Sequence, residues 1–199
     1  MEAVHLSIYD LSGAGAARED VLSEAERAQA ASLCLGRRRS DEWIRGRMSV
    51  RRALVSRFGE DASSTSLLVE ADGAPRLSGG VDCAVSLSHD GDYFAVAIAD
   101  QALMRVGVDI CLRQHEVRLR RILSRLKVRA SGIDVVTQWA AAECFLKVRR
   151  LGVAALLDTA LTLEQRDETI DVYTDGAKLS LSVSCFPEFV VAWGGEPTA

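Results

Sequence analysis

An internal repeat constrains the fold of this chain more than any other feature of its sequence. Trp43 and Trp139 lie 96 positions apart, and the same offset aligns Arg51 with Lys147. The offset also places a strand-like segment, residues 86–97, over residues 182–193 without a gap. A single shift that relates both a helix-like segment and strand-like segments is typical of a duplicated structural unit.

We therefore predict an α+β fold of two related halves, residues 1–100 and 101–199, each with a helix packed on a small antiparallel sheet. The halves would meet at a pseudo-two-fold axis. The chain has 199 residues, 48% of them apolar, which suffices for a packed core. Since each half is small, their interface is the expected place for a ligand site. An internal pseudo-dimer covers its own central interface, so we expect a monomer.

Local patterns predict the elements of the first half. An alternating run at residues 4–9 predicts a strand. Ser23 and Glu26 have the spacing of a capping box at the start of a helix that Gly36 would end. Ser40 is the expected N-cap of a second helix, and a polar loop should follow it. Strands are expected at residues 66–70, 81–87 and 93–99, with turns at 72–73 and 90–91.

Composition narrows the class of protein. No stretch of about 18 apolar residues is present, and the N-terminal residues lack the basic-then-apolar pattern of a signal peptide, so we expect a cytoplasmic protein without a membrane partner. The five cysteines are scattered and form no C-x-x-C pair, which argues against a disulfide framework or a zinc cage.

Basic residues concentrate in the middle of the chain. Residues 105–150 contain eleven bases and four acids, which favours an anionic partner, although a solvated helix face is an equal alternative. Within this block, residues 113–127 form an amphipathic basic stretch. A membrane surface or RNA would also suit such a stretch, but no interleaved aromatic residues support RNA, and we expect no nucleic-acid partner.

Two acidic side chains stand out because of their positions. Asp109 follows an apolar run that predicts a strand. Glu143 and Lys147 are four residues apart in an apolar helical segment, so both emerge on one face. Taken alone, this pair is most often a solvated ion pair. A strand carboxylate that meets a helix carboxylate can instead hold a hard divalent cation over a phosphate.

These segments resemble the signature motifs of the surfactin-type 4′-phosphopantetheinyl transferases. Residues 106–110 (Val-Gly-Val-Asp-Ile) and 139–147 resemble the signature pair of that family, whose second motif usually reads W-x-x-K-E-A/S-x-x-K. Residues 86–93 (Ser-Leu-Ser-His-Asp-Gly-Asp-Tyr) look like a third family block, and Gly46-Arg47 with Arg51 looks like its early G-R-x-x-x-R helix. The order of the motifs and the internal duplication agree with the two-lobed family fold.

The resemblance implies an enzyme that moves the 4′-phosphopantetheine arm of coenzyme A to a serine of an acyl or peptidyl carrier protein and releases 3′,5′-ADP, in natural-product or fatty-acid biosynthesis. It implies that Asp109 and Glu143 hold Mg²⁺ on the pyrophosphate, that Glu143 also takes the serine proton, and that Lys147 faces the pyrophosphate. The basic stretch 113–127 would dock an acidic helix of the carrier protein.

For coenzyme A, the resemblance implies that Arg47 and His89 hold the ribose 3′-phosphate, with Ser88 and Arg51 also at the binding site. The residues themselves leave simpler readings open. Outside the family pattern, His89 is better explained as an ordinary turn histidine, and Arg51 is consistent with a solvent-facing side chain. Gly107 is expected to allow a bend or bulge in its strand.

Three residues depart from the family pattern. Cys111 stands where many members have a third metal-binding glutamate, Ala142 where the second motif has a lysine, and Ala74 where a base usually meets coenzyme A phosphates. Arg45, Arg76 and Arg149 are candidate replacements for the two missing cations. The alternative prediction is a member of this fold that has lost the transfer reaction and binds a carrier protein or ligand, or catalyses another biosynthetic step.

Overall fold

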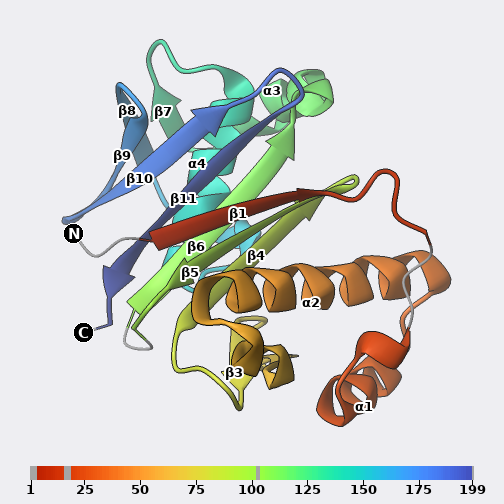
Figure 1. The fold of residues 1–199 in the computed structure, drawn as a ribbon. Coiled ribbons are helices and arrows are strands. Elements are labelled where there is room, and N and C mark those ends of the chain that lie inside the picture. Colours follow the sequence, from red (N-terminus) through yellow and green to blue (C-terminus); the bar gives the residue numbers. More distant parts are fainter. Residues whose placement is uncertain (1–3, 16–18, 102–103, 199) are drawn as a thin grey trace.

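The computed structural model describes residues 4–15, 19–101 and 104–198 and contains helices and sheets in an α+β arrangement (Figure 1). This confirms the predicted fold class. The helices are α1 (Glu24–Leu33), α2 (Arg37–Phe58), α3 (Glu116–Leu123) and α4 (Val135–Val148). The strands are β1 (Val4–Asp10), β2 (Ser66–Val69), β3 (Pro75–Ser78), β4 (Ala84–Asp90), β5 (Tyr93–Ala99), β6 (Met104–Leu112), β7 (Val128–Ala130), β8 (Leu161–Arg166), β9 (Thr169–Thr174), β10 (Ala177–Cys185) and β11 (Phe189–Pro197).

Strand pairing repeats with the offset that the sequence predicts. One sheet has the order β1-β5-β4, and the larger sheet begins with the order β6-β11-β10. In the β4–β5 pair Ser88 lies opposite Ala95, and in the β10–β11 pair Ser184 lies opposite Val191. Both pairs of positions differ by 96, so the repeat extends to the register of the strands.

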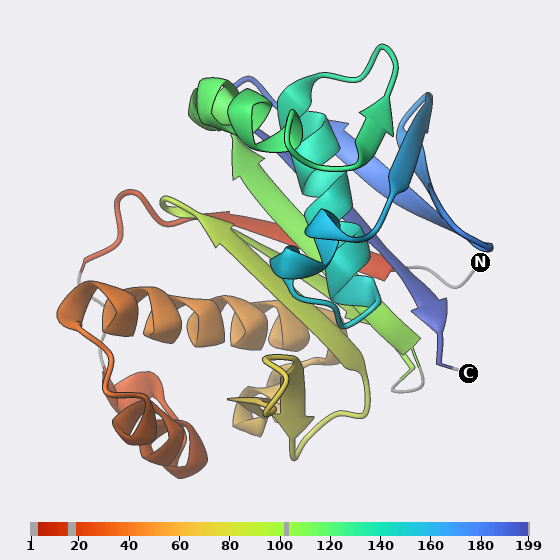
Figure 2. The same ribbon diagram turned by 180° about the vertical axis from the view of Figure 1, so that it is seen from behind.

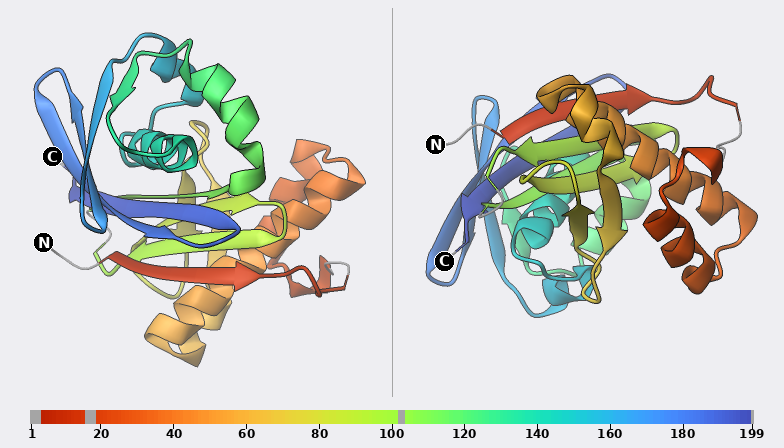
Figure 3. Two further views of the ribbon diagram at one scale, coloured as in Figure 1. Left: turned by 90° about the horizontal axis from the view of Figure 1, so that it is seen from above. Right: turned by 60° about the horizontal axis from the view of Figure 1, so that its bottom comes forward.

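The second sheet is larger than the sequence indicates. It continues beyond β10 through β9 and β8 to β7, and the β7–β8 pair is parallel whereas the other pairs are antiparallel. Figure 3 shows α4 nearly end-on, with this sheet curled around it and α3 on its other side. A small two-stranded sheet, β2-β3, lies beside α2.

Helices α2 and α4 each pack on a different sheet, and the two sheets share a core between them. The residues of β5 alternate between these environments: Val96 and Ile98 pack with α2, while Ala95 and Ala97 pack against β6 and β11. On β11, Val190 and Ala192 pack in the core of α4, and Val191 faces the shared core. This alternation follows from the two-residue period of a strand. Figure 2 shows α2 and α4 against different sheets.

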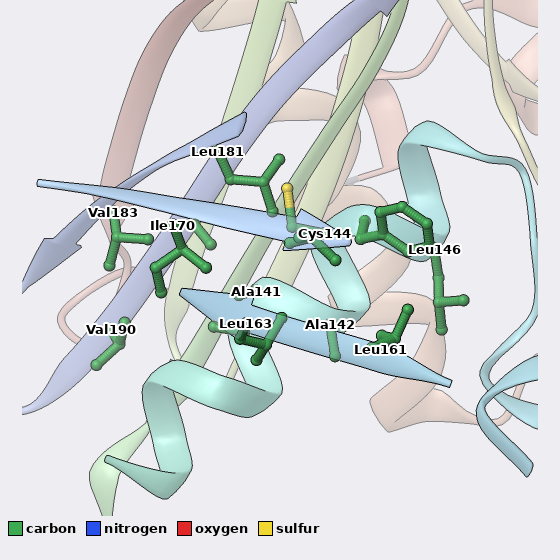
Figure 4. Close-up of a cluster of buried hydrophobic side chains, with 14 of the residues drawn as sticks. Ala141, Ala142, Cys144, Leu146, Leu161, Leu163, Ile170, Leu181, Val183 and Val190 are labelled. Carbon is green, nitrogen blue, oxygen red and sulfur yellow. The ribbon is translucent and has the colours of Figure 1, made fainter. Parts of the chain in front are cut away.

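The core around α4 combines small helix residues with large strand residues. Ala141, Ala142 and Cys144 of α4 are fully buried. Figure 4 shows them among side chains of the neighbouring strands, with Leu161 and Leu163 of β8 close to the helix. Alanines at these positions let the helix approach the curled sheet closely, as dense packing of a core requires.

The ends of the first two helices differ in part from the sequence prediction. The capping box of Ser23 and Glu26 is present, and α1 ends at Leu33 with Cys34 in the left-handed region (φ 47°). Ser40 is not an N-cap, because its backbone N–H already donates to the carbonyl of Gly36. Gly36, expected only as a stop, is the N-cap of α2, which therefore begins three residues before Ser40.

Some short elements also differ from expectation. The expected polar loop after α2 contains a 3₁₀ turn at Glu60–Ser64, and β4 begins and ends three residues later than predicted. Gly107 does not cause a bulge, because β6 pairs with β11 in unbroken register there. A Cβ at this position would lie 2.5 Å from the Cys144 carbonyl oxygen, so Gly107 permits close contact between β6 and α4.

Among the helices of the described residues, none has both the length and the apolar composition needed to cross a membrane.

Candidate active site

The structure brings Asp109, Ser88 and Lys147 together at the meeting point of the halves. Asp109 lies on β6 and is only 2% exposed. Its Oδ1 atom accepts hydrogen bonds from Ser88 Oγ on β4 and from Lys147 Nζ on α4, each at 2.8 Å. Lys147 Nζ also donates to the carbonyl oxygen of Val108 at 2.8 Å. These contacts compensate for burial of the Asp109 charge.

Glu143 lies one helical turn from Lys147, and its carboxyl group interacts electrostatically with that of Asp109. Burial, followed by repulsion from the Asp109 carboxylate, raises the pKa of Glu143 to about 8, although the nearby Lys147 acts to lower it. Asp90 contributes further repulsion. Two carboxyl groups this close share a proton at neutral pH unless a cation separates them.

The two carboxyl groups line a small cavity of about 190 Å³ between β4, β6, α3 and α4. Ser88 and His89 line it from β4, and Trp139 lines it from α4. The remaining polar lining includes Asp90, to which the sequence assigned no role, and His115 and Arg118, which belong to the basic stretch 113–127. Asp90 belongs to one of the recognised motifs, but nothing in its local spacing indicated a partner such as His115.

A larger cavity of about 610 Å³ lies on the other side of the Lys147–Asp109 ion pair. Four basic residues contribute to its lining: Arg76, Arg105, Lys147 and Arg150. Arg150 Nη1 is 3.1 Å from Glu70 Oε2, so part of this positive charge is already paired. The cavity has the size of a small-molecule site, and its cations suit an anionic ligand.

Arg47 and Arg51 lie away from both cavities, whereas the family resemblance implied that they contact coenzyme A. Arg51 Nη2 pairs with Glu26 Oε2 at 2.8 Å, and Glu26, a residue of α1, is fully buried. The Arg47 guanidinium lies 3.1 Å from the centre of the Trp43 ring, and desolvation lowers the Arg47 pKa to about 9. Neither arginine lines either cavity. Arg51 is 18% exposed, so it does not simply face solvent.

His89 lies at the small cavity but is not joined to Arg47. Its ring stacks on Phe94 with centroids 5.1 Å apart, and its Nε2 atom is 3.8 Å from a carboxylate oxygen of Glu42 on α2. Of the residues predicted to bind coenzyme A, the structure thus places Ser88 and His89 beside Asp109 and Glu143. It places Arg47 and Arg51 in the packing between α1 and α2.

The three departures from the family pattern have different structural settings. Cys111 is buried, and burial and neighbouring carboxylates raise the pKa of its thiol to about 12, so the thiol keeps its proton. Ala142 is fully buried in the hydrophobic core around α4, where a lysine would have no contact with solvent. Ala74 lines the large cavity with Arg76.

Among the candidate replacement cations, only Arg76 is at a cavity. Arg45 donates to backbone carbonyls that include Leu11 at 3.0 Å, and Arg149 pairs with Glu196 at 3.0 Å. Both are therefore committed to structural contacts.

The donor set of the small cavity fits a hard divalent cation. Asp109 and Glu143 offer carboxylate oxygens, the ligands that Mg²⁺ prefers, and their mutual repulsion is relieved by a cation. Within the described part of the chain, no group of three or more His, Cys, Asp or Glu residues is arranged to hold a metal ion. A cation at this pair would therefore need water or substrate oxygens as further ligands.

Comparison with known protein families finds a match in the first half of the chain. Residues 17–99 match the family model described as the 4′-phosphopantetheinyl transferase N-terminal domain. The matched segment includes Ser88 and His89 but ends before Asp109, Glu143 and Lys147. The match supports a 4′-phosphopantetheinyl transferase family, and hence a transferase. No curated protein matches the chain.

Proposed function

We propose that this protein transfers the 4′-phosphopantetheine arm of coenzyme A to a serine of an acyl or peptidyl carrier protein. The match of residues 17–99 to a transferase family supports this proposal. We further propose that it is a surfactin-type enzyme, an Mg²⁺-dependent holo-acyl-carrier-protein synthase that works as a cytoplasmic monomer in natural-product or fatty-acid biosynthesis. The observation that carries the proposal is the convergence of Asp109, Glu143 and Lys147 between two cavities.

Coenzyme A would place its anionic part in the large cavity. Arg76, Arg105 and Lys147 contribute positive charge there, and such charge stabilises both a bound pyrophosphate and the leaving 3′,5′-ADP. This assignment replaces Arg47 and Arg51 as the main phosphate contacts, because their guanidinium groups are directed to Trp43 and Glu26. His89 and Ser88 remain candidates at the edge of the small cavity.

Asp109 and Glu143 would hold Mg²⁺, which would neutralise charge on the pyrophosphate. Lys147 holds Asp109 in position through the 2.8 Å hydrogen bond and presents its own charge to the large cavity. Ser88 fixes the same carboxylate from β4. Orientation by three elements keeps the acidic pair in one geometry, as a phosphoryl-transfer site requires.

The carrier protein would dock near the small cavity. Basic residues of the stretch 113–127 lie on and around α3, and Arg118 lines the cavity itself. Arg118 forms no hydrogen bond or ion pair with the described residues, so its charge is available to an acidic partner. This supports the expectation of an acidic carrier helix at this face.

The test is intact-mass spectrometry of an apo carrier protein incubated with this protein, coenzyme A and Mg²⁺, with a chelated control. A metal-dependent gain of one phosphopantetheine arm is expected. Asp109→Asn should lower transfer by about 10²-fold or more, because it removes a charge that only a cation or Lys147 balances. Asp175→Asn, at an exposed turn residue, is the matched control. Absence of transfer to several carriers would contradict the proposal.

A second function is favoured by the buried, protonated thiol of Cys111, which supplies no third metal ligand. Under this alternative the fold retains ligand or carrier-protein binding, or another biosynthetic step, without the transfer. Calorimetry separates the two functions: binding of coenzyme A or an apo carrier protein without any mass gain would favour the alternative.

A further inference from the structure

Asp90 and His115 form a hydrogen-bonded pair in the lining of the small cavity. His115 lies in the 3₁₀ turn Arg113–His115 between β6 and α3, and its Nε2 atom is 3.0 Å from Asp90 Oδ1. The second carboxylate oxygen, Asp90 Oδ2, accepts the backbone N–H of Leu112 at 2.8 Å. With both oxygens engaged, Asp90 has a fixed orientation and in turn fixes the imidazole ring.

The other ring nitrogen of His115 is available. In the neutral ring, the Nε2–H group donates a hydrogen bond to Asp90, which leaves Nδ1 with a free lone pair. Among the described residues, no other one forms a hydrogen bond with the His115 side chain. The His115 side chain is 34% exposed and borders the cavity that Asp109 and Glu143 also line. A carboxylate that orients an imidazole whose second nitrogen is free is the arrangement by which histidine accepts protons from hydroxyl groups in enzymes.

The other candidate groups of this cavity are engaged elsewhere or buried. Glu143, to which the family resemblance assigns the serine proton, would give its carboxylate oxygens to a cation in the proposed reaction. Cys111 is only 4% exposed. Asp109 Oδ1 already accepts from Ser88 and Lys147. The His89 ring stacks on Phe94, and its Nε2 is directed to Glu42.

We infer that His115 is a further catalytic residue, the base that accepts the proton of the carrier serine, and that Asp90 is the positioning residue that orients it. The inference rests on the proposed transfer reaction. The serine Oγ–H proton moves to His115 Nδ1 while Oγ forms a bond to the phosphorus that bears pantetheine. The bond from that phosphorus to the oxygen of 3′,5′-ADP breaks, and its electron pair leaves with that oxygen. The imidazolium then releases its proton to solvent.

The test compares His115→Ala and His115→Gln with the wild type in the carrier-protein assay. We expect both variants to lower kcat by about 10²-fold or more with little change in KM for coenzyme A, because proton acceptance contributes on this scale. His115→Gln retains an N–H donor for Asp90, so it reports on the lost base even where the alanine variant folds poorly. His5→Ala is the control, since His5 lies on β1, outside both cavities.

Chemical rescue separates proton transfer from a structural role. Added imidazoles should restore kcat of His115→Ala, and the rescued rate should rise with the basicity of the imidazole. Asp90→Asn should lower kcat of the wild type while the His115→Ala background shows little further loss. A His115→Gln variant with kcat within threefold of the wild type, or a loss in His115→Ala that no imidazole restores, would overturn the inference.

The tautomer of His115 can be measured without any reaction. At a pH where the ring is neutral, nitrogen-15 NMR of the wild-type protein should show the His115 proton on Nε2, and a proton on Nδ1 would overturn the inference. A wild type that transfers nothing overturns the proposed function, and the role of His115 falls with it. A wild type that transfers normally beside a fully active His115→Gln overturns only the role of His115.

Discussion

Glu143, a buried carboxyl group of the candidate site, makes the stability of the fold depend on pH at the level of a single side chain. Its folded-state pKa is about 8, compared with an ordinary value of 4.5. Between these values the folded protein binds more protons than the unfolded chain, so raising the pH removes stability. We expect the metal-free protein to lose about 1–3 kcal/mol of unfolding free energy through this group between about pH 5 and 8.

Urea denaturation at a series of pH values in the presence of chelator measures this loss. Glu143→Gln should remove most of this pH dependence and be more stable than the wild type at pH 8. Glu168→Gln, which changes an exposed turn residue in the same half, is the control. The assignment of Glu143 would be wrong if both variants followed the wild-type curve. Mg²⁺ should stabilise the wild type but not Glu143→Gln.

Sequence reasoning expected Asp109, Glu143 and Lys147 to meet, the family resemblance added Ser88, and the structure brings these four side chains together. Arg47 lies apart from them, because its buried guanidinium packs on Trp43 of the same helix. The catalytic and ligand-binding roles of all these residues remain predictions.

At the scale of elements, the buried carboxylate of Glu26 on α1 forms hydrogen bonds with both α2 and β2. Glu26 Oε2 accepts from Arg51 at 2.8 Å and from the backbone N–H of its own capping residue, Ser23, while Oε1 accepts the Leu67 N–H at 2.9 Å. Glu26→Ala would leave Arg51 and a strand N–H without their partner. We expect this variant to lose about 3–5 kcal/mol of unfolding free energy.

Circular dichroism during urea unfolding checks this value. Glu24→Ala, two residues earlier on the exposed side of α1, should cost well under 1 kcal/mol. Glu26→Gln should fall between them, because the amide oxygen retains one acceptor. Equal stability of the two alanine variants would show that the buried contacts of Glu26 contribute nothing to the docking of α1.

Elements with strong periodicity or capping signals were predictable, as α1, β1 and β5 show. Strands of three or four residues, such as β3 and β7, are too short to display an alternating pattern. The sequence also did not predict that Ala142 is buried. It suggested a missing cation at this position, but the curled sheet around α4 makes it a core position. Sequence alone did not predict that curl, because it arises from the added strands β7–β9.

At the scale of the whole molecule, the two predicted halves pack around one common core, so we do not expect them to unfold independently. Ala95 and Ala97 of β5 pack in one core with Val108 of β6 and Val191 of β11. The backbone N–H of Val108 also donates to Ser86 Oγ on β4 at 3.1 Å. The boundary near residue 100 remains a prediction that the chain arose by duplication. The shared core predicts a single cooperative unfolding transition for both halves.

Tryptophans on both sides of the boundary allow a direct test. Trp43 reports on the first half and Trp139 on the second, so two double variants, Trp139→Phe with Trp193→Phe and Trp43→Phe with Trp193→Phe, each retain one reporter. Within each variant, fluorescence and far-ultraviolet circular dichroism should give the same urea midpoint, because loss of either half exposes the apolar surface between β5 and β6. A Trp43 signal that is lost at lower urea than the circular dichroism signal would mean that the first half unfolds alone. The site between the halves would then rest on an interface that can open, since Ser88 belongs to one half and Asp109 to the other.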